Sequence, residues 1–451
     1  MKGKKRIAAV MVMVLLMGML AGCGTEDKKK EESAKNNLVQ TEAVQTDEGE
    51  DIVLKYWTWF PSQDQLQETI DSFEAENPGI KVEMTVMEGL TFQEKVPLAL
   101  QSGEDIDIIG VQPSDFAKTV EDYLVDLDEL MPSVTGDNWL DGYSPDVLEK
   151  GKSLTDGKTK FITILNSGSN VGFYNAELLK EIGMDIPETI EEYKAVADAL
   201  YAKYPDKYAG VFAGMEGWIC GEMMLTILTQ QGDYYNRWLY DNAPLNSGEY
   251  TQAMIGLKQY FDMGIFKQDI MDLDSASAAE AFINGDALVY FTGSWEAPLL
   301  SSVLREHNGI GLNDVGVMAL PIVDKSGEPA VRAYLDCGIG IVASSKKQEA
   351  AAKFVQYLST GKGVQVLSRQ FLGVPGMLKV ESAPDMLTSD AAREGWDRLV
   401  ELMNHAPADR NNRTSWLPVI EGPCVQSVIN GSITPEEAVE QLQKEWDTGN
   451  Y

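Results

Sequence analysis

The sequence predicts an α/β protein in which strands and helices alternate along the chain. The chain has 451 residues, enough for two or three domains or for one large two-lobed unit. Residues 52–130 alternate between strand and helix patterns, and a second alternation begins at residue 171. The apolar content of 44% is ordinary for a globular core.

The first alternating region predicts a parallel sheet with helices on its faces. Residues 52–59 have the β-branched and aromatic richness of a buried strand. Residues 61–79 predict a helix, because Ser62 and Gln65 have the spacing of a capping box and apolar residues recur at helical spacing. Further strands are expected within 79–88 and 106–111, and further helices within 91–103 and 114–130. This order favours parallel pairing.

The second region continues the alternation. Residues 171–183 predict a strand followed by a helix, and residues 186–205 a helix that Thr189 and Glu192 begin as a capping box. The remaining expected elements are a helix, turn and strand within 278–300, a strand within 315–324, a strand pair or bent strand at 335–344, and helices at 345–360 and 435–446.

Aromatic and polar residues follow the first three predicted strands. In open α/β sheets, ligands bind outside the carboxyl ends of the strands. We therefore expect a ligand site at this edge, although helix capping is the alternative role of the serine and aspartate after the third strand. The residues concerned are Trp59 and Phe60 after the first strand, Glu88 after the second, and Gln112, Ser114 and Asp115 after the third.

The N-terminus predicts a bacterial lipoprotein. A basic start precedes an apolar run at 7–20, which is short for a bilayer span and typical of a signal peptide. Leu-Ala-Gly-Cys at 20–23 resembles a lipobox, which implies a signal peptide at 1–22 and a lipid on Cys23. The alternative is an ordinary signal peptide with a coincidental cysteine. Residues 23–50 would then be the lipidated cysteine and a disordered tether, because they contain no aromatic residue and few aliphatic ones.

Charge and composition exclude several classes of protein. The formal net charge is −33, and removal of the signal peptide would bring it to −37. Such a chain repels phosphate backbones, so nucleic acid is not an expected partner. Two histidines leave little material for a metal centre or a catalytic triad, and we expect no metal or cofactor. Cys220, Cys337 and Cys424 leave open one disulfide or three free thiols.

Six segments of the sequence, which together span nearly all of 51–451, carry a family resemblance. They are VLKYWTWF…FEAENPGIKVE, LALQSGEDIDIIGV, VGFYNAELLKEIGMDIPETIEEY, AFINGDALVYFTGSW, VGVMALPIVD and GSITPEEAVEQL. These segments resemble the family-1 extracellular solute-binding proteins of bacterial ABC importers, the group that includes maltose-binding protein. Ile106 stands where the family commonly has proline, a difference that we expect to be neutral.

The resemblance implies a two-lobed periplasmic-binding-protein-like fold (type II) with the ligand between the lobes. Lobe 1 would comprise 51–165 plus 316–360, and lobe 2 would comprise 166–315 plus 361–451. The implied function is solute capture by hinge closure and delivery to a membrane permease. We expect a monomer, lipid-anchored on the extracellular face of the membrane of a Gram-positive-type bacterium.

The aromatic residues at the expected edge favour a carbohydrate ligand, and we expect an oligosaccharide, because sugar rings have apolar faces and polar edges. Trp295 resembles the family's stacking position, Trp218 falls where the second lobe offers an aromatic residue, and Trp416 lies in a polar loop. Asn170, Tyr334 and Asp336 flank the expected crossovers, with a turn as the alternative role of Asn170. The expected ligand set is Trp59, Phe60, Glu88, Gln112, Ser114, Asp115, Asn170, Trp218, Trp295, Tyr334, Asp336 and Trp416.

Other functions fit the same sequence less well. An acidic protein with clustered rings also suits a polyamine, and the same fold binds peptides or presents a ligand to a signalling partner. A glycoside hydrolase with paired carboxylates is a further alternative, but 70 acidic residues make chance pairs uninformative. We therefore expect a binding protein and not an enzyme.

Overall fold

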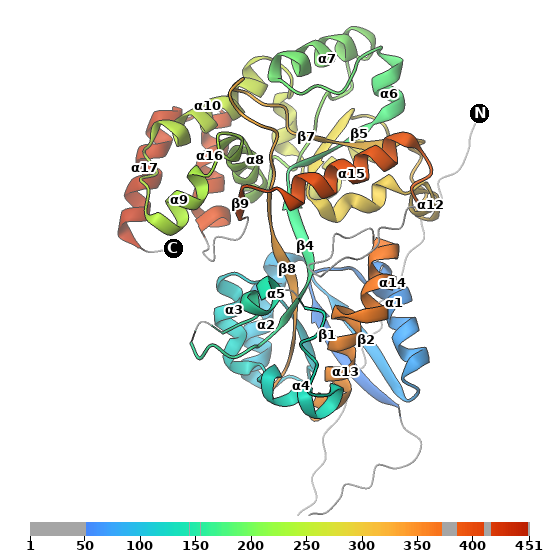
Figure 1. Cartoon of the computed structure of the whole chain (residues 1–451). Coiled ribbons are helices and arrows are strands. Elements are labelled where there is room, and N and C mark those ends of the chain that lie inside the picture. The colour runs from blue at the N-terminus through green and yellow to red at the C-terminus, as the bar shows by residue number, and fades with distance from the viewer. Residues whose placement is uncertain (1–50, 144, 154, 372–385, 410–415, 450–451) are drawn as a thin grey trace, which may run out of the picture. The chain divides into compact units, whose positions relative to one another are not determined.

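The computed structural model describes residues 51–143, 145–153, 155–371, 386–409 and 416–449 (Figure 1). The predicted signal peptide, the lipidated Cys23 and the tether lie outside the described residues. Within the described part of the chain, no helix combines the length and apolar character needed to cross a membrane.

The first sheet contains six strands, and we call this sheet and its helices lobe 1. Its order is β2-β1-β3-β8-β4, with β9 paired to β8. Strand β1 runs parallel to β2 and β3, as the sequence predicts, whereas β8 runs antiparallel to both β3 and β4. The strands are β1 (Ile52–Thr58), β2 (Ile80–Val86), β3 (Ile108–Val111), β4 (Ile162–Ser169), β8 (Arg332–Ile341) and β9 (Ala408–Asp409).

Seven helices belong to lobe 1 within the described ranges. The capping box of Ser62 and Gln65 is present at the start of α1, and Gly103 ends α2 in the left-handed conformation. Helix α14 packs against α1, and the two lie side by side (Figure 1). The helices are α1 (Gln63–Glu76), α2 (Gly89–Ser102), α3 (Asp115–Val120), α4 (Leu127–Thr135), α5 (Pro145–Lys150), α13 (Gln348–Ser359) and α14 (Gly361–Phe371).

The single helix predicted over 114–130 is wrong. The structure has α3, a short 3-10 turn η1 (Glu121–Tyr123) and α4 in its place. Leu124 leaves the helical path because it forms an antiparallel bridge with Val342. Asp126 then begins α4 by accepting a hydrogen bond from the backbone N–H of Asp128.

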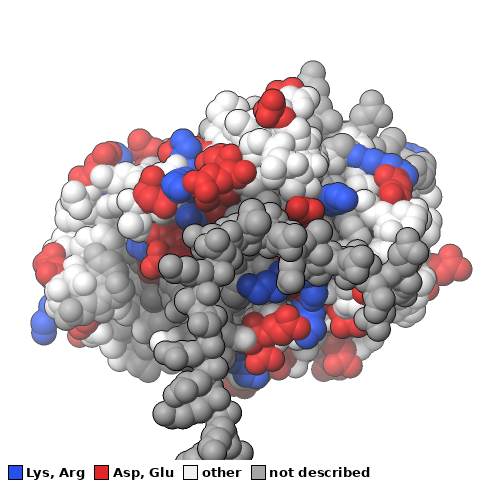
Figure 2. Space-filling view, turned by 90° about the horizontal axis from the view of Figure 1, so that it is seen from below, with Lys and Arg blue, Asp and Glu red and all other residues white. Residues whose placement is uncertain are grey.

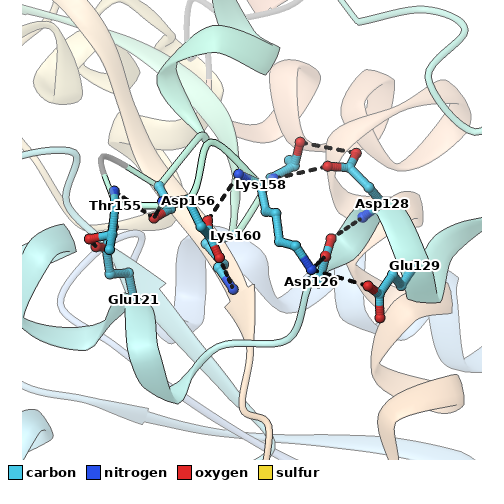
Figure 3. Close-up of polar contacts among 10 residues, drawn as sticks. Glu121, Asp126, Asp128, Glu129, Thr155, Asp156, Lys158 and Lys160 are labelled. Carbon is cyan, nitrogen blue, oxygen red and sulfur yellow. Dashed lines mark hydrogen bonds and ion pairs between the residues drawn. The ribbon is translucent and has the colours of Figure 1, made fainter.

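The segment between α5 and β4 is fixed to α4 by polar contacts (Figure 3). Lys158 Nζ lies 2.5 Å from Asp126 Oδ2 and 3.1 Å from Glu129 Oε1. The Asp128 carboxylate accepts hydrogen bonds from the backbone N–H and the hydroxyl of Thr159, at 3.0 and 3.1 Å. Because the Lys158 side chain is exposed, solvent screens these ion pairs, and each adds little to the stability of the fold.

The second sheet has three strands in the order β6-β5-β7, all antiparallel, and we call this sheet and its helices lobe 2. Its strands are β5 (Val171–Asn175), β6 (Val289–Thr292) and β7 (Val315–Ala319). A capping box begins α7, as predicted from Thr189 and Glu192, and a further capping box of Thr434 and Glu437 begins α17. One large hydrophobic cluster joins the sheet to its helices.

Lobe 2 is rich in helices. The α-helices are α6 (Ala176–Glu181), α7 (Ile190–Lys203), α8 (Gly217–Gln230), α9 (Tyr234–Asp241), α10 (Gly248–Asp262), α11 (Ser275–Ile283), α12 (Ser302–His307), α15 (Asp390–Asn404), α16 (Gly422–Ile429) and α17 (Pro435–Thr448). Shorter helical segments are the 3-10 helices η2 (Gln268–Asp272) and η3 (Ser294–Leu300) and the π-helical η5 (Leu417–Glu421).

Three elements lie in a different lobe from the one that the predicted lobe boundaries imply. Strand β9 pairs with β8 in the lobe 1 sheet, although 361–451 was expected in lobe 2. Strand β7 completes the lobe 2 sheet beside β5, although 316–360 was expected in lobe 1. Helix α14 packs on α1 of lobe 1, although residues from 361 onward were expected in lobe 2. The chain passes from β4 to β5 at Asn170 and from β7 to β8 after Ala319.

Candidate functional site

The carboxyl ends of β1, β2 and β3 lie at one edge of the lobe 1 sheet, because the three strands are parallel. Trp59 and Phe60 follow β1 and are half-buried, and both pack against the lobe 1 hydrophobic cluster that contains Leu54 and Phe354. The Trp59 ring lies 5.4 Å from the Phe92 ring, centroid to centroid. The edge therefore carries a partly exposed aromatic surface.

Gly110 on β3 makes room for this aromatic surface. A Cβ added there would lie 2.9 Å from Cζ3 of Trp59 and 2.6 Å from Oγ1 of Thr58. Any larger residue would displace the indole ring. The position of Trp59 thus depends on the neighbouring strand as well as on its own.

Three of the predicted polar residues form hydrogen bonds or ion pairs within the protein at the starts of helices. Glu88 is exposed and accepts hydrogen bonds from the backbone N–H groups of Leu90 and Thr91, at 3.1 and 3.0 Å. The N–H of Thr91 is the main reason that the pKa of Glu88 lies below its ordinary value. The other two begin α3: Ser114 accepts from the N–H of Phe116 at 3.3 Å, and Asp115 pairs with Lys118 at 2.7 Å.

Gln112 links the β3 edge to strand β8. Its amide oxygen accepts a hydrogen bond from Gln93 at 2.6 Å, and its amide nitrogen donates to the Tyr334 hydroxyl at 3.3 Å. The Tyr334 side chain is buried, and Asp336 lies two residues further on the same face of β8. The Asp336 carboxylate accepts from the backbone N–H of Cys337 at 2.7 Å. The structure thus brings Gln112 and Tyr334 together.

A buried polar network holds the crossover strands to α8. The last pair of the β4–β8 ladder is Ser169 with Arg332, and both side chains bind the carboxylate of Glu222 on α8. The Ser169 hydroxyl donates to Glu222 at 2.5 Å. Asn170, at φ 58°, donates from its side-chain amide to the Thr226 hydroxyl at 3.1 Å. Asn170 is therefore a buried crossover residue whose amide is already used within the protein.

Trp218 and Trp295 lie together in lobe 2. Their ring centroids are 6.4 Å apart, and both side chains are half-buried. The Trp218 indole N–H donates to Glu216 at 2.8 Å, which fixes the orientation of the ring. Trp295 is the second residue of η3, shortly after the end of β6, and it also packs against the lobe 1 cluster on which Trp59 and Phe60 lie. The structure thus places Trp295 beside Trp218 and against the hydrophobic cluster of lobe 1.

Trp416 lies in the core and not at a ligand surface. Its exposed fraction is 0%, and its ring packs against Trp238 and Trp446 at centroid distances of 6.2 and 5.2 Å. The sequence placed it in a polar loop, but helices α9 and α17 cover it. Trp416 is therefore not part of the candidate site.

The sequence analysis did not identify two carboxylates that lie beside Trp218 and Trp295. Glu216 positions Trp218, and Glu296 directly follows Trp295. Burial raises the pKa of Glu296 to about 7. Its position next to Trp295 was the one available signal, because nothing else distinguishes it among 70 acidic residues.

The cysteines, the candidate metal ligands and the surface charges add no further candidate site among the described residues. Cys220, Cys337 and Cys424 are free thiols, which settles the question that their spacing left open. Across the described ranges, no group of His, Cys, Asp and Glu residues has the arrangement of a metal site. Acidic and basic side chains are interspersed on the face shown in Figure 2 and do not form a single basic patch there.

Comparisons with known proteins agree with this architecture. The family model described as bacterial extracellular solute-binding protein matches residues 59–365, more than half of the chain. The chain is 26% identical over 377 residues to the multiple sugar-binding protein of Streptococcus mutans, with 81% of each chain covered.

Solved structures share the two-lobed fold. A protein from Caldanaerobius polysaccharolyticus, studied for xylan utilization, matches with a TM-score of 0.73 at 20% identity and covers 87% of this chain and 100% of that one. An ABC substrate-binding protein from Listeria monocytogenes, in complex with cycloalternan, matches with a TM-score of 0.70 at 17% identity, covering 89% and 99%. At these identities the likeness shows the fold alone.

Proposed function

Because the chain belongs to the bacterial extracellular solute-binding proteins, we propose that it captures an oligosaccharide by hinge closure and delivers it to the membrane subunits of an ABC importer. The family consists of binding proteins and not enzymes. In this proposal the lipid on Cys23 holds the protein at the extracellular face of the membrane, and the acidic chain binds no nucleic acid.

The observation that carries the sugar assignment is the pair of half-buried indole rings, Trp218 and Trp295. Flat apolar rings suit the apolar faces of sugar rings. Trp295 also packs on the cluster that holds Trp59 and Phe60, so closure around a sugar would bring rings from both lobes to it. The name of the Streptococcus mutans relative supports the same substrate class.

The polar part of the proposed site is smaller than the sequence suggested. Gln112 and Tyr334 lie at the β3 edge and carry groups that both donate and accept hydrogen bonds, as sugar hydroxyls require. Glu88, Ser114, Asp115, Asn170 and Asp336 remain proposed lining residues, each with a partner in the protein that a ligand would have to share or displace.

Thermal melting of the purified protein against a panel of ligands tests this function. The panel contains mono- and oligosaccharides, peptides and polyamines. A ligand at 100-fold its Kd raises the free energy of unfolding by about 2.7 kcal/mol, which raises the melting midpoint. We expect a shift with one family of sugars. A shift with a peptide or a polyamine alone would contradict the sugar assignment and leave solute capture intact.

The variant Trp295→Ala tests the site itself. We expect it to lose most of the sugar-induced shift, because it removes the ring on which the sugar stacks. Tyr240→Ala is the matched control, since Tyr240 lies on α9 with 59% of its surface exposed. If Trp295→Ala kept the full shift, the site would lie elsewhere on the protein.

A further inference from the structure

Glu296 occupies a distinctive position beside the paired tryptophans. It lies in η3, one residue after Trp295, and its side chain is half-buried. Tyr290 on β6 is buried, and the negative charges of Glu296 and Glu216 add to burial in raising the pKa of its hydroxyl. Both carboxylates therefore lie near the Tyr290 ring, on the part of lobe 2 that holds Trp218 and Trp295.

The two carboxylates differ in their hydrogen bonds. Glu216 accepts from the Trp218 indole N–H and from the backbone N–H of Ser275, each at 2.8 Å. Among the residues that the structure describes, none donates a hydrogen bond to the Glu296 carboxylate or forms an ion pair with it. Glu216 thus positions a ring, whereas Glu296 keeps its acceptor capacity for another group.

A half-buried carboxylate without donors is costly to a folded protein. Burial disfavours its charged form, and a carboxylate offers about four lone-pair positions that water or a donor must fill. The buried Glu222, by contrast, is served by Ser169 and Arg332. A half-buried carboxylate that lacks donors and lies beside paired aromatic rings is typical of functional sites.

We propose that Glu296 contacts the bound solute and accepts hydrogen bonds from its hydroxyl groups while Trp295 stacks on the adjacent sugar ring. This inference rests on the proposed function and deepens it. It assigns the lobe 2 side of the site a carboxylate acceptor for a neutral polyhydroxyl ligand.

The charges around the site favour a neutral sugar over a polyamine. Several ammonium groups require several available carboxylates flanked by rings. Glu88 is occupied by helix N–H groups, Asp115 by Lys118, and Glu216 by two donors. Glu296 alone among these four carboxylates has no donor within the described residues.

Calorimetric titration of the wild-type protein and of Glu296→Gln tests the inference. The probes are maltose, raffinose, stachyose, oligosaccharides from xylan and chitin, and spermidine. We expect Glu296→Gln to weaken sugar binding at least about tenfold, as for the loss of one hydrogen bond to a charged group. Its melting midpoint without ligand should equal or exceed that of the wild type, because the variant removes a buried charge. Glu306→Gln, an exposed change on α12, should bind as the wild type does.

The outcomes separate this inference from the proposed function. Sugar binding by the wild type with an unchanged Kd in Glu296→Gln would overturn the role of Glu296 and leave the proposed function standing. If the wild-type protein bound only spermidine, or nothing from the panel, the sugar assignment would be overturned before any variant was compared. The proposed contact between Glu296 and sugar hydroxyl groups would then fail as well.

Discussion

Glu421 is a fully buried carboxyl group in η5 that the proposed site does not use. Burial raises its pKa to about 7, although the hydrogen bond from the Tyr250 hydroxyl and the charge of Arg332 act to lower it. The unfolded chain releases this proton near the ordinary value of 4.5. The folded protein therefore keeps a proton that the unfolded chain has already lost between these two pH values.

We predict that Glu421→Gln becomes progressively more stable than the wild type as the pH rises from 4.5 to 7. In this range the native state binds more protons than the unfolded state, so the wild type loses stability as the pH rises. Each unit of pKa difference corresponds to about 1.4 kcal/mol, so the gain should be on the order of 2–3 kcal/mol. Urea unfolding at pH 5 and pH 8 measures it, with Glu306→Gln as control. Parallel profiles for Glu421→Gln and wild type would contradict the raised pKa.

Sequence reasoning reached the aromatic residues better than the carboxylates. Trp218 and Trp295 could be identified as candidates because tryptophan is rare in the chain, with nine residues, and because each of the two lies in a recognisable sequence pattern. Glu296 could not be distinguished among 70 acidic residues, because its isolation from donors depends on the packing of distant segments. Trp416 was misplaced for the same reason, since Trp238 and Trp446 bury it.

At the scale of elements, helix starts that depend on neighbouring residues could be predicted from the sequence. Strand pairings between distant residues could not. The capping boxes predicted for α1 and α7 each need four neighbouring residues, and both are confirmed. Strand β4 was not predicted, because Asn166, Ser167 and Gly168 favour a loop. Pairing along β8, from Ile162 with Ile339 to Ser169 with Arg332, makes it a strand. Such pairings join residues far apart in the sequence.

The crossover ribbon of β4 and β8 is held to α8 by a buried ion pair. We predict that Arg332→Met lowers the free energy of unfolding by about 3–5 kcal/mol, because it leaves the Glu222 carboxylate buried without its cation. The double variant Glu222→Gln/Arg332→Met should recover part of this loss, since neither charge then remains buried. Chemical unfolding measures both.

Lys158→Met provides the matched control for this pair. Lys158 is exposed, so solvent screens its ion pairs with Asp126 and Glu129, and the change should cost much less stability than Arg332→Met. Equal losses in Lys158→Met and Arg332→Met would show that burial does not govern the strength of the Arg332 pair.

At the scale of the whole molecule, each sheet is assembled from separate stretches of chain. Strand β8 returns to lobe 1 after the chain has built lobe 2, and α15 to α17 return to lobe 2. The motifs of the sequence predicted this two-lobed class, whereas the positions of β7 and α14 became clear only from their partners β5 and α1. In the proposed function, two crossover segments carry the motion that closes the lobes on a solute.

Small-angle X-ray scattering of the protein during titration with the sugar that raises its melting midpoint tests capture by closure most directly. We expect the radius of gyration to fall and to level off at one sugar per protein, with Trp295→Ala showing no fall at the same sugar concentration. A radius of gyration that stays constant while the sugar saturates the wild type would contradict closure as the mode of capture.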